Sequence, residues 1–291
     1  MTRPITVGVD HSTDSRVAGE WAAREAERRG LPLRLVHVWL DEPAFLAPPD
    51  RAEAERLLGA FASETAARHP GLEVTGEVVI GSPVARLVDQ GARAELLVLG
   101  ARGAAPGHAG AAGGAGFPPG SVSLPVAAHA TGPVVLVRKA PFGTPHAERE
   151  VVLGLDTTEP AAAPLLDCAF TLAAARGAVL RAVRVFGPPA ALSRDAAESI
   201  RRSGSGEAAE RAGQALRAAL APWRRRFPQV PVVPHLRFGN AAEELLAAAS
   251  GRGPLLLGRR TNRPPLSPRL GPTARVVLHH SRVPVLVVPH D

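Results

Sequence analysis

Two stretches in the first half of the sequence carry residue types that could hold an anion. Asp10 ends the apolar run "ITVGVD" and is followed by imidazole and hydroxyl groups in "HSTDS". The apolar run "LLVLG" ends at Gly100 and enters a glycine-rich tract that finishes with Gly120 and Ser121. Glycine lets a backbone approach phosphate oxygens, and a helix N-terminus presents free N–H groups to an anion. These residues predict a phosphate-binding turn, although a glycine-rich tract can also be a linker.

Regular alternation of strands and helices would bring these residues together. Short apolar runs predict strands at residues 5–10, 33–39, 73–81, 95–100 and 133–139. The segments between them predict helices at residues 15–30, 49–69, 83–92 and 121–130. Such alternation builds a mostly parallel sheet with helices on both faces, and ligands bind beyond the carboxyl ends of its strands. The sequence therefore predicts an α/β fold with its site at that edge.

The second half of the chain repeats the first half in the same order. The stretch "ITVGVDHSTDS" returns as "VVLGLDTTEPA", and "LRLVHVW" returns within "VLRAVRVF". A repeat of about 150 residues has the size of a domain. We predict two homologous domains, residues 1–140 and 149–291, each with a five-stranded sheet. The Pro and Gly residues of "KAPFGTPHAE" suit a short linker between them.

Composition limits the classes of partner. The chain has 291 residues, of which 34 are basic and 27 acidic, giving a formal net charge of +7. The charges are interspersed and Tyr is absent, so nucleic acid is not an expected partner. The single Cys excludes an intramolecular disulfide, and the apolar runs are too short to cross a bilayer. Since the N-terminal residues also lack a secretory pattern, we expect a cytoplasmic protein.

The remaining reactive side chains predict no metal or catalytic group. His129, His279 and His280 have no partner at a metal-ligand spacing, so we expect them on the surface. His108 is expected to be a solvated residue of the glycine-rich tract, and Cys168 a small core residue. The three Trp residues, Trp21, Trp39 and Trp223, are expected to serve in packing and not in stacking on a base. The sequence contains neither a G-x-S-x-G elbow nor a Walker A motif, so we expect no enzyme of those classes.

At this point the motifs resemble those of a known family. The "GARG" and "GSVS" motifs, with an Asp at the end of the first strand, are similar to the universal stress protein family, as are "LVHVW" and "PVVLVR". The resemblance covers almost the whole chain, in tandem. It implies a Rossmann-like fold related to adenine nucleotide α-hydrolases and a stress-response regulator that binds ATP, with or without Mg. It also implies pairing of the two domains within one chain, with a homodimer as a further arrangement.

The resemblance also implies which residues surround the nucleotide. In the first domain these are Asp10, His11, Ser12, Val38, Gly100, Arg102, Gly103, Gly120, Ser121, Val122 and Ser123. In the second domain they are Asp156, Val185, Gly258, Thr261, Gly271 and Thr273. Asp10 and the backbone near Val38 would contact the adenosine part, and Gly100, Gly103, Gly120 and Ser121 would surround the ribose and phosphates. Ser121 and Ser123 could instead cap the helix that follows.

Both halves depart from the family pattern Gly-x2-Gly-x9-Gly-(Ser/Thr). Sixteen residues, not nine, separate Gly103 from Gly120. In the second half Thr261 replaces a glycine, and Pro272 stands where a hydroxyl residue is expected and removes one N–H donor. Three functions therefore stay open: an ATP-binding regulator, an interaction module whose sites no longer bind nucleotide, and an ATP pyrophosphatase-type enzyme. The stretch "DHSTDS" only faintly resembles the loop of the last class, because it lacks paired glycines.

Overall fold

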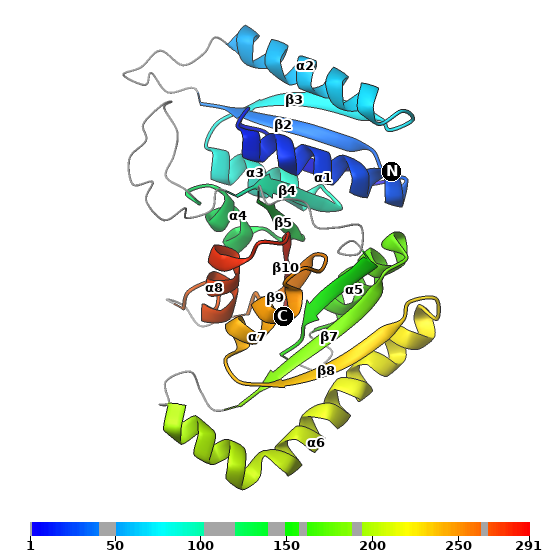
Figure 1. The fold of residues 1–291 in the computed structure, drawn as a ribbon. Helices are drawn as coiled ribbons and strands as arrows, with labels where there is room; N and C mark the ends of the chain where they lie inside the picture. Colours follow the sequence, from blue (N-terminus) through cyan, green and yellow to red (C-terminus); the bar gives the residue numbers. More distant parts are fainter. Residues whose placement is uncertain are drawn as a thin grey trace. The chain divides into compact units, whose positions relative to one another are not determined.

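The chain folds into two compact units, Met1–Ala140 (unit 1) and Pro141–Asp291 (unit 2). The computed structural model describes residues 2–40, 51–101, 120–138, 149–156, 162–187, 194–262 and 267–291, with the backbone alone for 194–205. Each unit is an α/β domain with a parallel sheet (Figure 1). The predicted fold class is confirmed.

Unit 1 alternates strands and helices along its described length. Its elements are β1 (Ile5–Gly8), α1 (Thr13–Arg29), β2 (Leu33–Trp39), α2 (Arg51–Arg68), β3 (Val74–Ile80), α3 (Pro83–Ala92), β4 (Leu96–Gly100), α4 (Ser123–His129) and β5 (Val134–Val137). The strands lie in the order β3-β2-β1-β4-β5, and each neighbouring pair is parallel. The order reverses at β1, which β2 and β4 flank. In open α/β sheets such a point of reversal is the usual place for a ligand site.

Unit 2 repeats this arrangement. Its elements are β6 (Glu150–Gly154), α5 (Ala163–Arg176), β7 (Val179–Phe186), α6 (Arg194–Arg226), β8 (Val232–Phe238), α7 (Ala241–Ala249), β9 (Leu255–Arg260), α8 (Pro272–His280) and β10 (Val285–His290). The strands lie in the order β10-β9-β6-β7-β8, again parallel. The central strand β6 therefore occupies the place that β1 has in unit 1.

Glycines allow helices to approach the sheet of unit 1 from both faces. A Cβ on Gly8 of β1 would touch Leu87 of α3, and a Cβ on Gly100 of β4 would touch the backbone of α1. On the second of these faces, a Cβ on Gly76 would touch Leu58 of α2. The helices α1 and α2 thus cover one face, while α3 and α4 pack together on the other (Figure 1). The apolar strands are covered on both sides, as expected of a parallel sheet.

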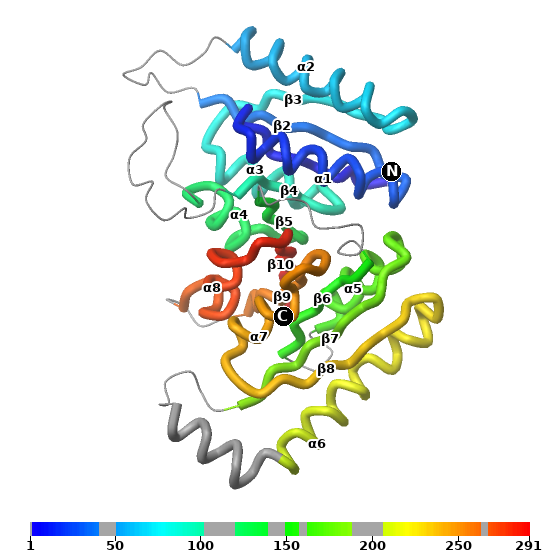
Figure 2. The backbone as a smooth tube through the Cα atoms, viewed as in Figure 1, coloured from blue at the N-terminus to red at the C-terminus, as the bar shows by residue number. Residues whose placement is uncertain are grey.

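The largest difference between the units follows the second strand. Helix α6 has 33 residues, against 18 in α2. It lies against β7 and β8 (Figure 2). Near its end, Trp223 stacks on Phe227 and on Phe170 of α5, with ring centroids 6.3 and 6.0 Å apart. The expectation that Trp223 serves in packing is confirmed. Cys168 was expected in the core but is only half-buried, because it lies between the buried face and the solvent face of α5.

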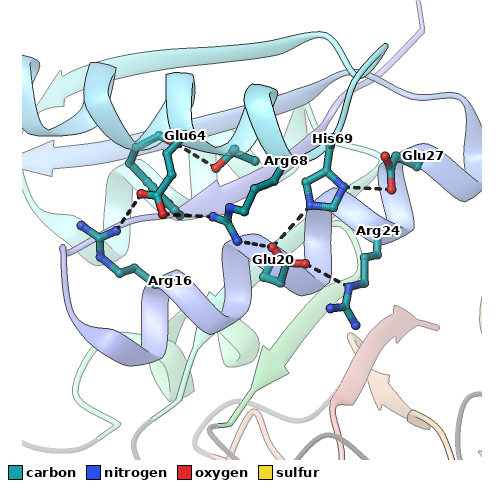
Figure 3. Close-up of polar contacts among 9 residues, drawn as sticks. Arg16, Glu20, Arg24, Glu27, Glu64, Arg68 and His69 are labelled. Atoms are coloured by element: carbon teal, nitrogen blue, oxygen red, sulfur yellow. Dashed lines mark hydrogen bonds and ion pairs between the residues drawn. The ribbon is translucent and has the colours of Figure 1, made fainter. Parts of the chain in front are cut away.

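A polar network joins α1 to the end of α2 (Figure 3). Glu20 accepts hydrogen bonds from Arg24 at 3.0 Å and Arg68 at 2.6 Å, and His69 lies between Glu20 and Glu27 at 3.4 and 3.0 Å. Burial on its own raises the pKa of Glu20, but the hydrogen bond from His69 and the charges of Arg24 and Arg68 outweigh it and hold the pKa below its usual value.

Candidate functional site

The turn after β1 presents a carboxylate held by its neighbour. Asp10 Oδ1 accepts hydrogen bonds from the backbone N–H of Ser12 at 3.0 Å and from its hydroxyl at 2.5 Å. Ser12 is also the N-cap of α1, since its Oγ accepts from the Ser15 N–H. The hydroxyl therefore fixes the start of the helix and the exposed carboxylate together. The predicted residues Asp10, His11 and Ser12 form one hydrogen-bonded turn.

His11 sits at the centre of this turn and packs on an imidazole from β2. Its φ of 60° places it in the left-handed region, where His is one of the better tolerated residues. The rings of His11 and His37 have centroids 4.8 Å apart, tilted by 35°. His37 Nδ1 donates to the Val9 carbonyl at 2.8 Å, and because a carbonyl only accepts, Nδ1 carries the proton. The sequence analysis did not select His37 as a site residue, because β2 lies beside the Asp10 turn only in the folded chain.

The backbone of Val38, the predicted contact on β2, lies at the same edge of the sheet as the Asp10 turn. Odd-numbered residues of β2 form backbone hydrogen bonds with β3, since the Gly81 N–H donates to the Trp39 carbonyl. Even-numbered residues face β1 instead, since the Val9 N–H donates to the Val36 carbonyl. The paired register of β1 and β2 ends at Gly8 and Val36. The Val38 N–H therefore points towards the residues that follow the paired part of β1.

Gly100 ends β4 next to the Asp10 turn. β1 and β4 pair with Gly8 opposite Leu99, so continuing this register places Asp10 level with Ala101. A Cβ on Gly100 would lie 2.6 Å from the Asp14 carbonyl carbon. Gly100 is therefore needed for packing against α1, whatever it does for a ligand. The predicted residues Arg102 and Gly103, and the tract with His108, lie outside the described residues.

The chain returns to the described part of unit 1 at Gly120, whose φ of 81° suits glycine. Helix α4 begins at Ser123, two residues later than predicted, because Gly120, Ser121 and Val122 form a turn before it. Val122 is the N-cap, and neither serine caps the helix with its side chain. Ser123 is buried, whereas Ser121 is half-buried. Of the two hydroxyls, that of Ser121 is the more accessible to a ligand.

The matching edge of unit 2 is occupied by the protein's own groups. Asp156 pairs with Arg260 at 3.6 Å. The His290 ring fills the space beside Gly258, where a Cβ would lie 2.4 Å from its Nε2. Thr261 donates from its N–H to the His290 carbonyl at 2.7 Å, and its hydroxyl donates to the Asp291 carboxylate. The predicted ligand groups around β9 thus bond to the last two residues.

The other predicted residues of unit 2 lie at the same edge. Val185 occupies the place in β7 that Val38 has in β2. Gly271 is the N-cap of α8 and has an extended backbone, with φ −67° and ψ 163°. Pro272 is the first residue of the helix, which has no side-chain cap. Thr273, half-buried in the first turn, does not cap the helix. The structure therefore brings the predicted second set to one edge of unit 2, where the Thr261 hydroxyl is bonded to Asp291 and the Thr273 hydroxyl does not cap the helix.

Arg138 is a further charged residue at the unit 1 edge that the sequence analysis did not select. It follows β5, which pairs with β4 so that Val137 lies opposite Gly100. Burial lowers the pKa of Arg138, and the carboxylate of Asp14 partly opposes this shift. Its position directly after the last strand of "PVVLVR" was the available signal, because that strand ends at the ligand edge.

No cluster of three or more His, Cys, Asp or Glu residues with metal-binding geometry occurs in the described ranges. His279 and His280 are exposed on α8, and His129 is exposed on α4, as expected. Within the same ranges, no helix combines the length and apolar character that a membrane span requires.

The fold and site define a duplicated α/β protein that places the predicted site residues of each copy at the carboxyl ends of its strands. The sequence profile of the universal stress protein family matches residues 1–138 and 148–289. The chain belongs to the universal stress protein family.

Relatives of known name match the chain along nearly its full length. A universal stress protein of Mycobacterium bovis is 28% identical over 298 residues, covering 97% of this chain and 96% of that protein. The crystal structure of a universal stress protein from Archaeoglobus fulgidus superposes with a TM-score of 0.68 and 19% identity, covering 98% of both chains. Another A. fulgidus member, solved in complex with dAMP, covers 49% of this chain at 17% identity and a TM-score of 0.36.

Proposed function

We propose that this protein is a cytoplasmic stress-response regulator that binds one adenine nucleotide, ATP, at the strand ends of unit 1. Nucleotide occupancy changes the balance between two conformations by its different affinity for each, and so reports energy status. The protein acts by binding and has no strong catalytic activity.

The observation that carries this proposal is that the backbone of Val38 and the hydrogen-bonded carboxylate of Asp10 both lie at the carboxyl end of the central strands of unit 1. The Val38 N–H points past the end of β1, and the Asp10 carboxylate is held beside it by Ser12. A backbone donor suits the ring nitrogens of a purine, and a carboxylate accepts from ribose hydroxyls. The turn at Gly120 and Ser121 leads into a helix start, which suits phosphate.

Unit 2 has the same fold but a different chemical surface at this edge. Its carboxylate Asp156 faces the guanidinium of Arg260, and Thr261 is bonded to His290 and Asp291. A nucleotide would have to break these contacts before it could bind. The proposal is therefore one nucleotide per chain, with unit 2 as an interaction module.

Titration calorimetry of the purified protein with ATP tests the proposal. We expect one site per chain, and we expect Asp10→Ala to weaken binding about tenfold, the loss of one hydrogen bond to a charged group. Asp156→Ala is the matched control, because Asp156 holds the same place in unit 2. The proposal is wrong if the native protein shows no binding at millimolar ATP, or if the two variants lose affinity equally.

Two alternative functions make different predictions in the same preparation. An interaction module without nucleotide binding is favoured by the bonded edge of unit 2, and would show no heat with ATP in either unit. An ATP pyrophosphatase-type enzyme would release pyrophosphate and form AMP in the presence of a co-substrate. We expect release of phosphate and pyrophosphate no faster than with heat-denatured protein.

A further inference from the structure

The pair of imidazoles at the unit 1 crevice is not required by the fold. In the duplicated sequence the places of His11 and His37 are taken by Thr157 and Arg184. The strand registers agree, because Gly8 pairs with Val36 in unit 1 and Gly154 pairs with Val183 in unit 2. One copy of the fold therefore exists without any imidazole at these positions.

The His11 side chain holds a polar atom that the protein leaves unsatisfied. Its Nε2 is buried and has no hydrogen-bond partner within the part of the chain that the structure describes. A buried polar nitrogen without a partner costs free energy, typically about 1–3 kcal/mol. The turn fixes this ring, since Asp10 and Ser12 on either side of it are hydrogen-bonded to each other. The geometry thus presents an unused nitrogen where the nucleotide is proposed to bind.

The surroundings of His11 disfavour protonation of its ring in the free protein. Burial lowers the pKa of His11, and the nearby His37 of β2 and Arg16 of α1 lower it further, while Asp10 opposes them. The charge of Arg16 is itself offset by Glu64 of α2, 3.2 Å away. A multiply charged anion entering this crevice would reverse the balance, because it attracts the protonated ring.

We propose that His11, positioned by His37, couples nucleotide binding in unit 1 to the uptake of a proton. The inference rests on the proposed function and adds its regulation. The protonated ring donates from Nε2 to an oxygen of the nucleotide, and the negative charge of the phosphates stabilises the imidazolium. Because linkage is reciprocal, affinity for the anionic nucleotide rises as pH falls, and bound nucleotide raises the pKa of His11.

The test measures proton uptake on ATP binding at about pH 6.5, where a His side chain titrates. Titrations in two buffers of different ionisation enthalpy give the number of protons taken up by the native protein and by His11→Asn. Asn tolerates the left-handed backbone but does not titrate. The ionisation of ATP is the same for both proteins, so the difference between them isolates His11. His280→Asn, an exposed His on α8, is the matched control.

We expect the native protein and the His280 variant to take up more protons than His11→Asn. Between about pH 8 and pH 5.5 their affinity should rise more than that of the variant, by up to about threefold to tenfold, the limiting effect of a half-unit to one-unit rise in the pKa of one group. Equal proton uptake by native protein and His11→Asn overturns the coupling but leaves the proposed function. Failure of the native protein to bind ATP at any pH overturns both.

Discussion

The backbone of Gly100 lies directly against the first turn of α1, with the site for a Cβ only 2.6 Å from the Asp14 carbonyl carbon and 2.8 Å from the Ser15 nitrogen. Both atoms belong to the first turn of α1, which Ser12 caps, so they can shift only together with the start of the helix. The glycine at the start of the glycine-rich tract is therefore part of the helix–sheet packing, and its presence is not by itself a sign of phosphate binding.

Gly100→Ala should lower the free energy of unfolding by about 1–3 kcal/mol, the usual cost of overpacking. The added methyl group pushes α1 away from β4. Urea unfolding monitored by circular dichroism measures the change. Gly59→Ala on α2, where a Cβ would meet nothing within 4 Å, is the control and should not destabilise the protein. An unchanged stability for Gly100→Ala would contradict the packing role.

Ser12→Ala should reduce both stability and nucleotide affinity. The loss of the N-cap costs about 1 kcal/mol, and the Asp10 carboxylate loses the hydroxyl that orients it. Asn240 caps α7 of unit 2 with its side chain, so Asn240→Ala should cost similar stability and leave affinity unchanged. Chemical unfolding and ATP titration separate the two effects. Equal affinity losses in both variants would show that the effect comes from stability alone.

Glu20 should make the stability of unit 1 depend on acidic pH. Its pKa in the folded protein lies below the ordinary value of 4.5, so its stabilising effect is fully present above that pH and is lost as pH falls through the lowered pKa. Glu20→Gln should lower stability by about 1–2 kcal/mol at neutral pH and flatten this dependence. Unfolding midpoints measured from neutral to acidic pH test this. Glu95→Gln, at an exposed residue, should keep the native pH dependence.

Gly258 and His290 should show strong coupling in a double-mutant cycle. Gly258→Ala places a methyl group against the buried imidazole and should cost about 1–3 kcal/mol. In a His290→Ala background the same substitution should cost little, because the ring is gone. Unfolding of the four proteins gives the coupling energy. Additive effects would contradict this prediction, because they would mean that the His290 ring moves aside in Gly258→Ala at no cost in free energy.

Much of this architecture could be predicted from the sequence, because strand and helix periodicity and the repeat are local patterns. The cap at Ser12, the proline at the start of α3 and the left-handed glycine after α1 follow the same local rules. These signals place Asp10 and Gly100 at strand ends, and a parallel sheet then brings those ends to one edge.

The contacts that decide the chemistry of the two edges could not be predicted in this way. His37 meets His11, and Thr261 meets Asp291, only after strands distant in the sequence have paired. The position of a glycine in the sequence also does not show why it is there. Gly258 keeps the family spacing, which predicts a ligand contact, yet its missing side chain makes room for the His290 ring. Sequence spacing shows where a glycine stands and not which group lies beside it.

The proposed use of the Val38 amide has a consequence for genetics. Any substitution other than proline retains this N–H, so a mutational scan would score the position as tolerant even if the amide is indispensable for purine recognition. Selection would leave little trace there, and only chemical replacement of the amide by an ester would reveal its contribution.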